Sequence, residues 1–291
     1  MPNLFRNFAR LRSLQVAVVA VGIAGCAAPA VRAPFDDART APTSAQIAAL
    51  VASPDRSPAD RALDARRKPV ETLAFIGVRP GMTALDVSAG GGYTTELIAR
   101  AVGPTGRVYG QSAPPDPART PPAMREGGDG MRAAGAVPPP APRRTTPMAL
   151  AERAKNPAAA NIVAVLMPYD NPVPPDIAAQ SLDLVTLMFN YHDFGHMGVD
   201  RTSMNRAIFA ALKPGGLYVI ADHAGRTGTG ISESGTLHRV EEAFVVGEVE
   251  AAGFRLAERG DYLRNPNDPR DRNTPEPPQP KDEFVLKFRK P

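Results

Sequence analysis

A cluster of three glycines, Gly90-Gly91-Gly92, could bind an anionic ligand. It follows an apolar run at residues 83–87, typical of a buried strand, and precedes a helix-like segment at residues 94–100. Glycines at such a turn permit positive φ angles and let a ligand approach the main chain. The free N–H groups at a helix start favour negative charge, so a nucleotide-like ligand fits here. The alternative is that the glycines serve the turn geometry alone.

A second group able to do chemistry is Asn190-Tyr191-His192-Asp193, which follows an apolar run at residues 183–189. A histidine can accept a proton from a nucleophilic oxygen or nitrogen, and a neighbouring carboxylate can orient it. Ligands of open parallel sheets bind beyond the carboxyl ends of the strands, so this group is expected to face the glycine turn. We predict that Tyr191, His192 and Asp193 contact the reacting group. The alternative is that they only satisfy backbone groups of their loop.

The chain has four histidines, and all follow residue 190: His192, His196, His223 and His238. Histidines with carboxylates could hold a metal ion, but these spacings match no known ligand motif, so no metal is predicted. A single cysteine, Cys26, leaves no intramolecular disulfide and no site with several Cys ligands within these residues.

The chemistry must be positioned by alternating strands and helices. A helix is predicted over residues 57–75, interrupted near Pro69, with Asp60, Asp64, Arg67 and Lys68 spaced for pairing within it. Further helices are predicted at residues 148–155, 201–212 and 233–252, and further strands at 107–111, 161–166, 217–222, 255–262 and 283–289.

The order and spacing of these segments resemble the class I S-adenosylmethionine (SAM) dependent methyltransferases. The segments 67–69, 75–82, 190–193 and 284–291 look like an exported bacterial branch of that superfamily, and the resemblance runs from about residue 56 to the C-terminus. It implies an α/β fold, Rossmann-like, with a mostly parallel seven-stranded sheet that ends in an antiparallel hairpin. It also implies S-adenosyl-L-methionine as the cofactor.

The resemblance assigns roles to residues at the strand ends. His192 with Asp193 would deprotonate the methyl acceptor, and Asp170 or the Tyr169 ring would meet the adenine. Gln111 would contact the ribose where the family usually has a carboxylate, and Ser88 replaces the first glycine of the usual turn. The predicted cofactor-binding residues are Asp86, Ser88, Ala89, Gly90, Gly91, Gly92, Gln111 and Asn190.

The N-terminus reads as an export signal. Basic residues precede an apolar run at 14–24, which is too short for an ordinary membrane span. Residues 23–26, Ile-Ala-Gly-Cys, resemble a bacterial lipobox, so residues 1–25 are predicted to be a lipoprotein signal and Cys26 the lipidated residue. The alternative is a plain cleaved signal. Ala27 implies the outer membrane, and the predicted location is therefore the periplasm.

Composition and charge predict the domain boundaries and the kind of partner. Residues 26–54 read as an Ala/Pro-rich tether, and residues 55–291 as the methyltransferase-like domain, with a low-complexity insertion at about 113–147. The net charge of +4 is modest and the basic residues are spread out, so no nucleic-acid partner is expected. A small-molecule substrate is expected.

Two alternatives to an exported methyltransferase stay open. SAM is made in the cytoplasm and is too polar to diffuse through a membrane, and Gln111 stands where the family has an acid. A methyltransferase-like binding protein that has lost catalysis is therefore one alternative. An exported enzyme with a metal at the histidines is the other.

The lipobox makes a direct prediction about Cys26. Substitution Cys26→Ser removes the thiol that would carry the lipid, so the variant should take up no palmitate in metabolic labelling while the wild type is labelled. An unlabelled wild-type protein would remove the lipoprotein interpretation.

Overall fold

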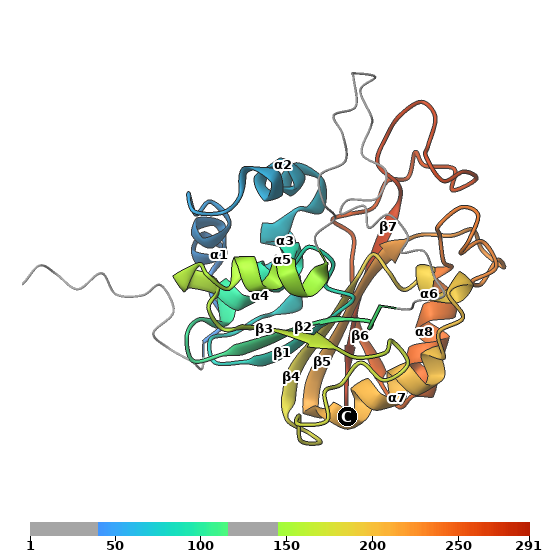
Figure 1. Cartoon of the computed structure of the whole chain (residues 1–291). Helices are drawn as coiled ribbons and strands as arrows, with labels where there is room; N and C mark the ends of the chain where they lie inside the picture. The colour runs from blue at the N-terminus through green and yellow to red at the C-terminus, as the bar shows by residue number, and fades with distance from the viewer. Residues whose placement is uncertain (1–39, 116–144) are drawn as a thin grey trace, which may run out of the picture. The chain divides into compact units, whose positions relative to one another are not determined.

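The central element of the fold is a seven-stranded sheet with strand order β3-β2-β1-β4-β5-β7-β6 (Figure 1). The computed structural model describes residues 40–115 and 145–291. The strands are β1 (Thr83–Val87), β2 (Arg107–Ser112), β3 (Ile162–Leu166), β4 (Leu182–Met188), β5 (Leu212–His223), β6 (Arg255–Gly260) and β7 (Glu283–Arg289).

The first five strands run parallel, and β7 pairs antiparallel with both β5 and β6. Central strands of a parallel sheet are covered on both faces, which explains why Ala84, Leu85 and Val87 of β1 are all fully buried. Strand order reverses between β1 and β4, which are neighbours although far apart in sequence. The predicted fold class, a Rossmann-like sheet with a C-terminal antiparallel pair, is confirmed.

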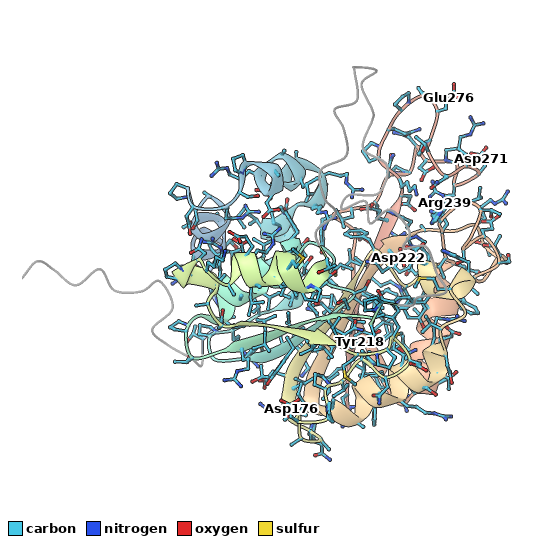
Figure 2. All side chains as sticks on the ribbon, viewed as in Figure 1. Asp176, Tyr218, Asp222, Arg239, Asp271 and Glu276 are labelled. Atoms are coloured by element: carbon cyan, nitrogen blue, oxygen red, sulfur yellow. The ribbon has the colours of Figure 1, made fainter. Side chains whose placement is uncertain are left out.

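Helices cover both faces of the sheet and form two apolar cores (Figure 1). One core includes side chains of α1 (Ser44–Val51), α3 (Pro69–Ile76), α4 (Tyr93–Val102) and α5 (Thr146–Arg153). The other includes side chains of α7 (Arg201–Ala211) and α8 (Glu242–Ala251). The remaining helices are α2 (Pro58–Arg67), the short α6 (Asp193–His196) and the 3-10 turn η1 (Pro157–Ala159). Figure 2 shows Tyr218 and Asp222 of β5 in the packed interior, and both are fully buried.

The N-terminal helices refine the predicted domain boundary. Thr43 and Gln46 form a capping box at the start of α1, and Ile47 and Leu50 are buried in the core. Residues 44–51 therefore belong to the fold rather than to a tether that ends at residue 54. The predicted interruption at Pro69 is confirmed, because Lys68 adopts a φ of 43° between α2 and α3.

The charged residues of α2 pair with other elements, which differs from the intrahelical pairing that their spacing predicted. Asp64 binds Arg56 of the preceding loop at 2.7 Å, and Asp60 binds Arg153 of α5 at 2.5 Å. Asp60 and Arg56 are almost fully buried, so these ion pairs attach α2 to the neighbouring elements and do not lie on its solvent-exposed surface.

The predicted helix over residues 233–252 is wrong in its first half, because α8 begins only at Glu242. The preceding segment extends the sheet instead. Val240 is fully buried, its N–H donates to His223 O, and it forms a parallel bridge with Ala224. Burial of Val240 beside β5 thus overrides helix propensity and leaves His238 in a loop with a φ of 51°.

Several sequence predictions lie outside the described residues: the lipoprotein signal at 1–25, the lipidation of Cys26, the start of the tether and most of the insertion at about 113–147. Within the described residues, no helix is long and apolar enough to cross a membrane.

Two glycines test the packing in opposite directions. A Cβ at Gly92 would lie 2.6 Å from Leu150 Cδ2 of α5, and the φ there is 87°. Gly92→Ala should therefore destabilise the fold by about 1–3 kcal/mol. Gly247 lies inside α8 with open space around it, so Gly247→Ala should stabilise the fold by about 0.5–1 kcal/mol. Urea unfolding measures the change in the free energy of unfolding for each variant. Changes of the same sign in the two variants would contradict the packing described.

Candidate functional site

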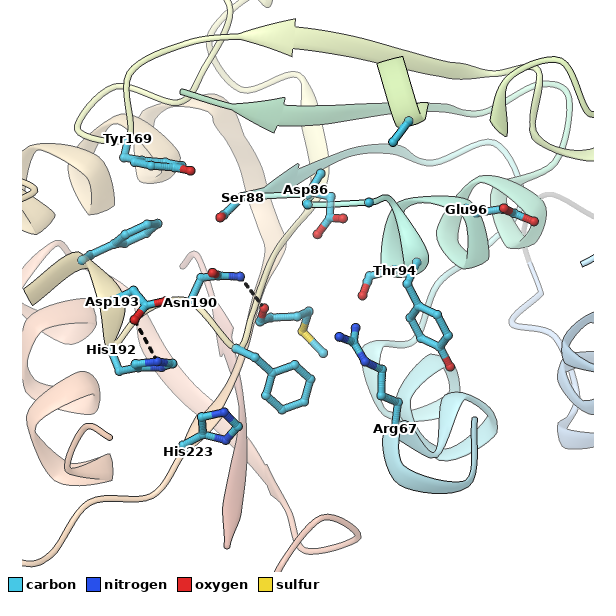
Figure 3. Close-up of a pocket in the computed structure, with 18 of the residues that line it drawn as sticks. Arg67, Asp86, Ser88, Thr94, Glu96, Tyr169, Asn190, His192, Asp193 and His223 are labelled. Carbon is cyan, nitrogen blue, oxygen red and sulfur yellow. Dashed lines mark hydrogen bonds and ion pairs between the residues drawn. The ribbon is translucent and has the colours of Figure 1, made fainter. Parts of the chain in front are cut away.

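A cavity of about 900 Å³ lies along the carboxyl ends of β1, β4 and β5 (Figure 3). It is at the large end of the range for small-ligand sites, about 300–1,000 Å³. One wall is the glycine turn after β1, and the other is formed by Asn190, His192 and Asp193 with three further histidines. The cavity thus occupies the switch point between β1 and β4, where open α/β sheets bind their ligands.

Asp86 fixes the position of the glycine turn. Its side chain is buried, and its two oxygens accept hydrogen bonds of 2.6 Å from Thr95 of α4 and from Thr186 of β4. Burial raises the pKa of Asp86 to about 6, although the two hydroxyls oppose that rise by stabilising the carboxylate. One side chain therefore joins the strand, the following helix and the neighbouring strand.

The glycine turn adopts the geometry that its sequence predicts. Ser88 and Gly90 both have a φ of 56°, and Ser88 through Gly91 line the cavity. Among the described side chains none caps the start of α4, and its first residues, Tyr93 and Thr94, also line the cavity. The turn and the helix start together offer main-chain N–H groups to an anionic ligand. Gly92 has a structural role, because the absence of a side chain there leaves space for the side chains of α5.

Gln111 does not have the predicted role. Its side chain is fully buried, Oε1 accepts from Ser88 N at 2.9 Å, and Nε2 donates to Met167 O at 2.5 Å. The amide therefore ties the glycine turn to the end of β3, and both its ends are used inside the protein. It is a positioning residue rather than a ribose contact.

Tyr169 and Asn190 both line the cavity, whereas Asp170, the other residue predicted to meet the adenine, is not among its lining residues. The Tyr169 ring packs against Phe194 with centroids 4.7 Å apart, so it is held as part of the wall. Asn190 donates from Nδ2 to Met188 O at 3.0 Å. Figure 3 shows Asn190 between the glycine turn and His192.

Tyr191 is a correction to the predicted catalytic set. The ring is fully buried, and its hydroxyl bonds to Glu248 at 2.7 Å and to Asn205 at 3.2 Å. Burial, with the nearby Glu248 carboxylate, raises the pKa of Tyr191 well above its usual value. Tyr191 thus ties β4 to α7 and α8 and faces the opposite core from the cavity.

His192 lies between two carboxylates. Its Nδ1 is 2.6 Å from Asp222 and its Nε2 is 3.1 Å from Asp193. Although burial disfavours the charged ring, Asp222 and Asp193 raise the pKa of His192 to about 9. The ring is therefore protonated near neutral pH in the absence of other ligands and donates hydrogen bonds to both carboxylates.

The other three histidines gather around the same point. His238 Nδ1 is 2.9 Å from Asp193, and His196 Nδ1 is 3.9 Å from it. The His223 ring lies 5.2 Å from the His192 ring, and burial with the nearby Lys281 charge lowers the pKa of His223 well below its usual value. These rings form the end of the cavity opposite the glycine turn.

Two residues that help to form the site were not among the predicted site residues. Asp222 orients His192, and its place at the carboxyl end of β5 was the available signal. Arg67 lines the cavity at the end of α2, with its guanidinium 4.8 Å from the Tyr93 ring centroid and 5.6 Å from that of Phe189. Its helical spacing suggested pairing within the helix, which hid this position.

The fold is similar to that of a solved methyltransferase structure. A SAM dependent methyltransferase from Aquifex aeolicus superposes with a TM-score of 0.51 and 16% identity, over 85% of this chain and 98% of that chain. The YcgJ protein from Bacillus subtilis superposes with a TM-score of 0.49 and 13% identity, over 75% of this chain and 95% of that chain. A TehB-like SAM-dependent methyltransferase from Corynebacterium glutamicum superposes with a TM-score of 0.44 and 14% identity, over 81% of this chain and 100% of that chain. No protein-family model and no curated protein matches the sequence. At this identity, the first similarity establishes the fold alone.

The charge on His192 can be measured in metal-free protein. NMR titration should give a pKa of about 9, and Asp222→Asn should lower it by about 1–3 units because an adjacent opposite charge is lost. Since the folded pKa exceeds the usual 6.5, this charge stabilises the fold fully below about pH 6.5, and the contribution is lost as pH rises through 9. A wild-type value near 6.5 would contradict the assigned pairing.

Proposed function

We propose that the protein binds S-adenosylmethionine in the cavity and transfers the methyl group to a small-molecule acceptor. The observation that carries this proposal is the continuity of the cavity from the glycine turn to Asn190, His192 and Asp193. A cofactor seated on the turn and an acceptor seated at the histidines would then share one cavity. The methyltransferase fold supports the same assignment, by analogy of architecture.

The lining residues suit the parts of the cofactor. Gly90, Gly91 and the start of α4 offer main-chain N–H groups, and Arg67 offers a cation, to the carboxylate of the methionine part. The carboxylate of Asp86, beneath the turn, has the sign that suits the cofactor's ammonium and sulfonium charges. Ala89 and the Tyr169 ring provide apolar surface for the adenosine part.

The chemistry requires mainly orientation. The sulfonium supplies an activated methyl group, so the protein needs to hold the donor and the acceptor in line and exclude water. His192, whose two ring nitrogens face Asp222 and Asp193, holds the Asp193 carboxylate in the cavity wall, and that carboxylate accepts a hydrogen bond from an acceptor O–H or N–H. Burial tends to raise the pKa of Asp193, but His192 and His238 hold it near 2, so this carboxylate stays charged.

A binding protein without methyl transfer is the second candidate. Gln111 stands where the family usually has an acid, and both ends of its amide already bond to Ser88 and Met167. The ribose therefore lacks a charge-assisted bond at the end of β2. Such a protein would bind the cofactor or its demethylated product and show no turnover.

We further propose that the protein acts outside the cytoplasm, in the periplasm, held to the outer membrane by a lipid on Cys26. The lipobox-like residues 23–26 and the preceding apolar run support this location.

Calorimetry of the full chain tests cofactor binding. SAM or S-adenosylhomocysteine should bind with micromolar affinity or better, about −8 kcal/mol or more favourable. Gly90→Val should abolish binding, because a branched side chain fills the cavity wall and resists a φ of 56°. Gly247→Ala, on α8, is the matched control and should bind like the wild type.

The outcomes separate the candidates. Binding that is lost in Gly90→Val, while circular dichroism shows that the variant is still folded at the assay temperature, supports the cofactor site, and methyl transfer from labelled SAM then distinguishes an enzyme from a binding protein. An absence of heat with both ligands, on folded wild-type protein, would overturn the proposal.

A further inference from the structure

The Asp193 carboxylate is surrounded by imidazole nitrogens. Its Oδ1 lies 3.1 Å from His192 Nε2, 2.9 Å from His238 Nδ1 and 3.9 Å from His196 Nδ1. His192 is buried, whereas Asp193 and His238 are only partly buried. These groups therefore sit in the cavity wall with one side toward the open space.

The distances fit the spacing of ligands around one metal ion. Zinc bonds to histidine nitrogen and carboxylate oxygen are about 2.0–2.2 Å long, so two ligand atoms of a tetrahedral site lie about 3.3–3.5 Å apart. The distances from Asp193 Oδ1 to His192 Nε2 and to His238 Nδ1 are within about 0.5 Å of that spacing. All three ligand atoms lie within 4.8 Å of one another. An ion can be accommodated with small side-chain movements.

Outer contacts hold two of these rings in place. Asp222 is fully buried and bonds to His192 Nδ1 at 2.6 Å, which directs Nε2 toward Asp193. Histidine ligands of metals commonly have such a carboxylate on their second nitrogen. His196 is held by Ser234, whose Oγ is 3.0 Å from its Nδ1.

The backbone of His238 also points to a constrained position. It has a φ of 51°, a conformation that a residue with a side chain rarely adopts. Val240, two residues further on, is bridged to Ala224 just after β5. The left-handed backbone at His238 places its imidazole ring against Asp193.

We propose that His192 Nε2, an Asp193 carboxylate oxygen and His238 Nδ1 bind a divalent first-row transition metal ion, with a coordination position open to the cavity. Two imidazoles and one carboxylate suit zinc and iron(II), and three protein ligands with an open position characterise catalytic rather than structural sites. His196 is the nearest further nitrogen ligand.

This site lies at the acceptor end of the cavity, opposite the glycine turn (Figure 3). An oxygen, nitrogen or sulfur atom of a small molecule could take the open position. The metal site itself does not depend on SAM, so it is tested without the cofactor. Failure of either proposal then leaves the other standing.

The spacing in sequence predicted no metal, because His238 follows Asp193 by 45 residues. The competing explanation is a set of ion pairs in which charged imidazoles surround one carboxylate. That arrangement needs no metal, and metal binding distinguishes the two.

The test uses full-length protein freed of metal with a chelator and titrated with Zn²⁺, then with Co²⁺ for its visible spectrum. We expect one ion per chain at micromolar affinity or tighter, and a cobalt spectrum typical of mixed nitrogen and oxygen ligands. His238→Ala and Asp193→Asn should each weaken binding at least tenfold. His238 lies in a loop, so its variant should retain the fold.

Two further variants complete the design. Asp222→Asn should weaken metal binding about 10–100-fold, because it acts through His192 as a positioning residue. Asp176→Asn is the matched control: this exposed carboxylate lies apart from Asp222 (Figure 2) and should leave binding unchanged. No stoichiometric binding to the wild type, or equal affinity in wild type and His238→Ala, would overturn the metal site.

Discussion

The buried Asp86 carboxylate is the constraint on which the site depends. Its hydrogen bonds to Thr95 and Thr186 join β1, α4 and β4 at the point where strand order reverses. A buried carboxylate left without partners would be costly, so these three elements are held in one arrangement. The glycine turn and the end of β4 consequently face each other across a fixed gap, and that gap is the cavity.

A second buried network holds the opposite wall. Asp222 accepts from the main-chain N–H groups of His192 and His223 and also bonds to the His192 ring. It thereby attaches the loop after β4 to the end of β5. With Gln111 tying the turn to β3, side chains at the ends of neighbouring strands are fastened to one another rather than to solvent. This rigidity favours binding and orientation over acid–base chemistry.

The sequence predicted the fold well, because apolar runs such as Thr83–Val87 and the Gly90–Gly92 turn are local signals. It predicted side-chain roles less well. Tyr191 and His192 are neighbours on the chain but point to opposite sides, one into the α7 and α8 core and one into the cavity. The roles of Gln111 and His238 depend on Met167 and Asp193, which lie 56 and 45 residues away, and no local pattern carries such contacts.

The most direct test of this account is a crystal structure grown with S-adenosylhomocysteine and Zn²⁺, with diffraction data collected at the zinc absorption edge. The account predicts ligand density over Gly90 and Gly91, beside Tyr169, and an anomalous peak within bonding distance of His192, Asp193 and His238. Ligand density away from the glycine turn, or an empty turn in a crystal saturated with the ligand, would contradict its central claim that this cavity is a cofactor site.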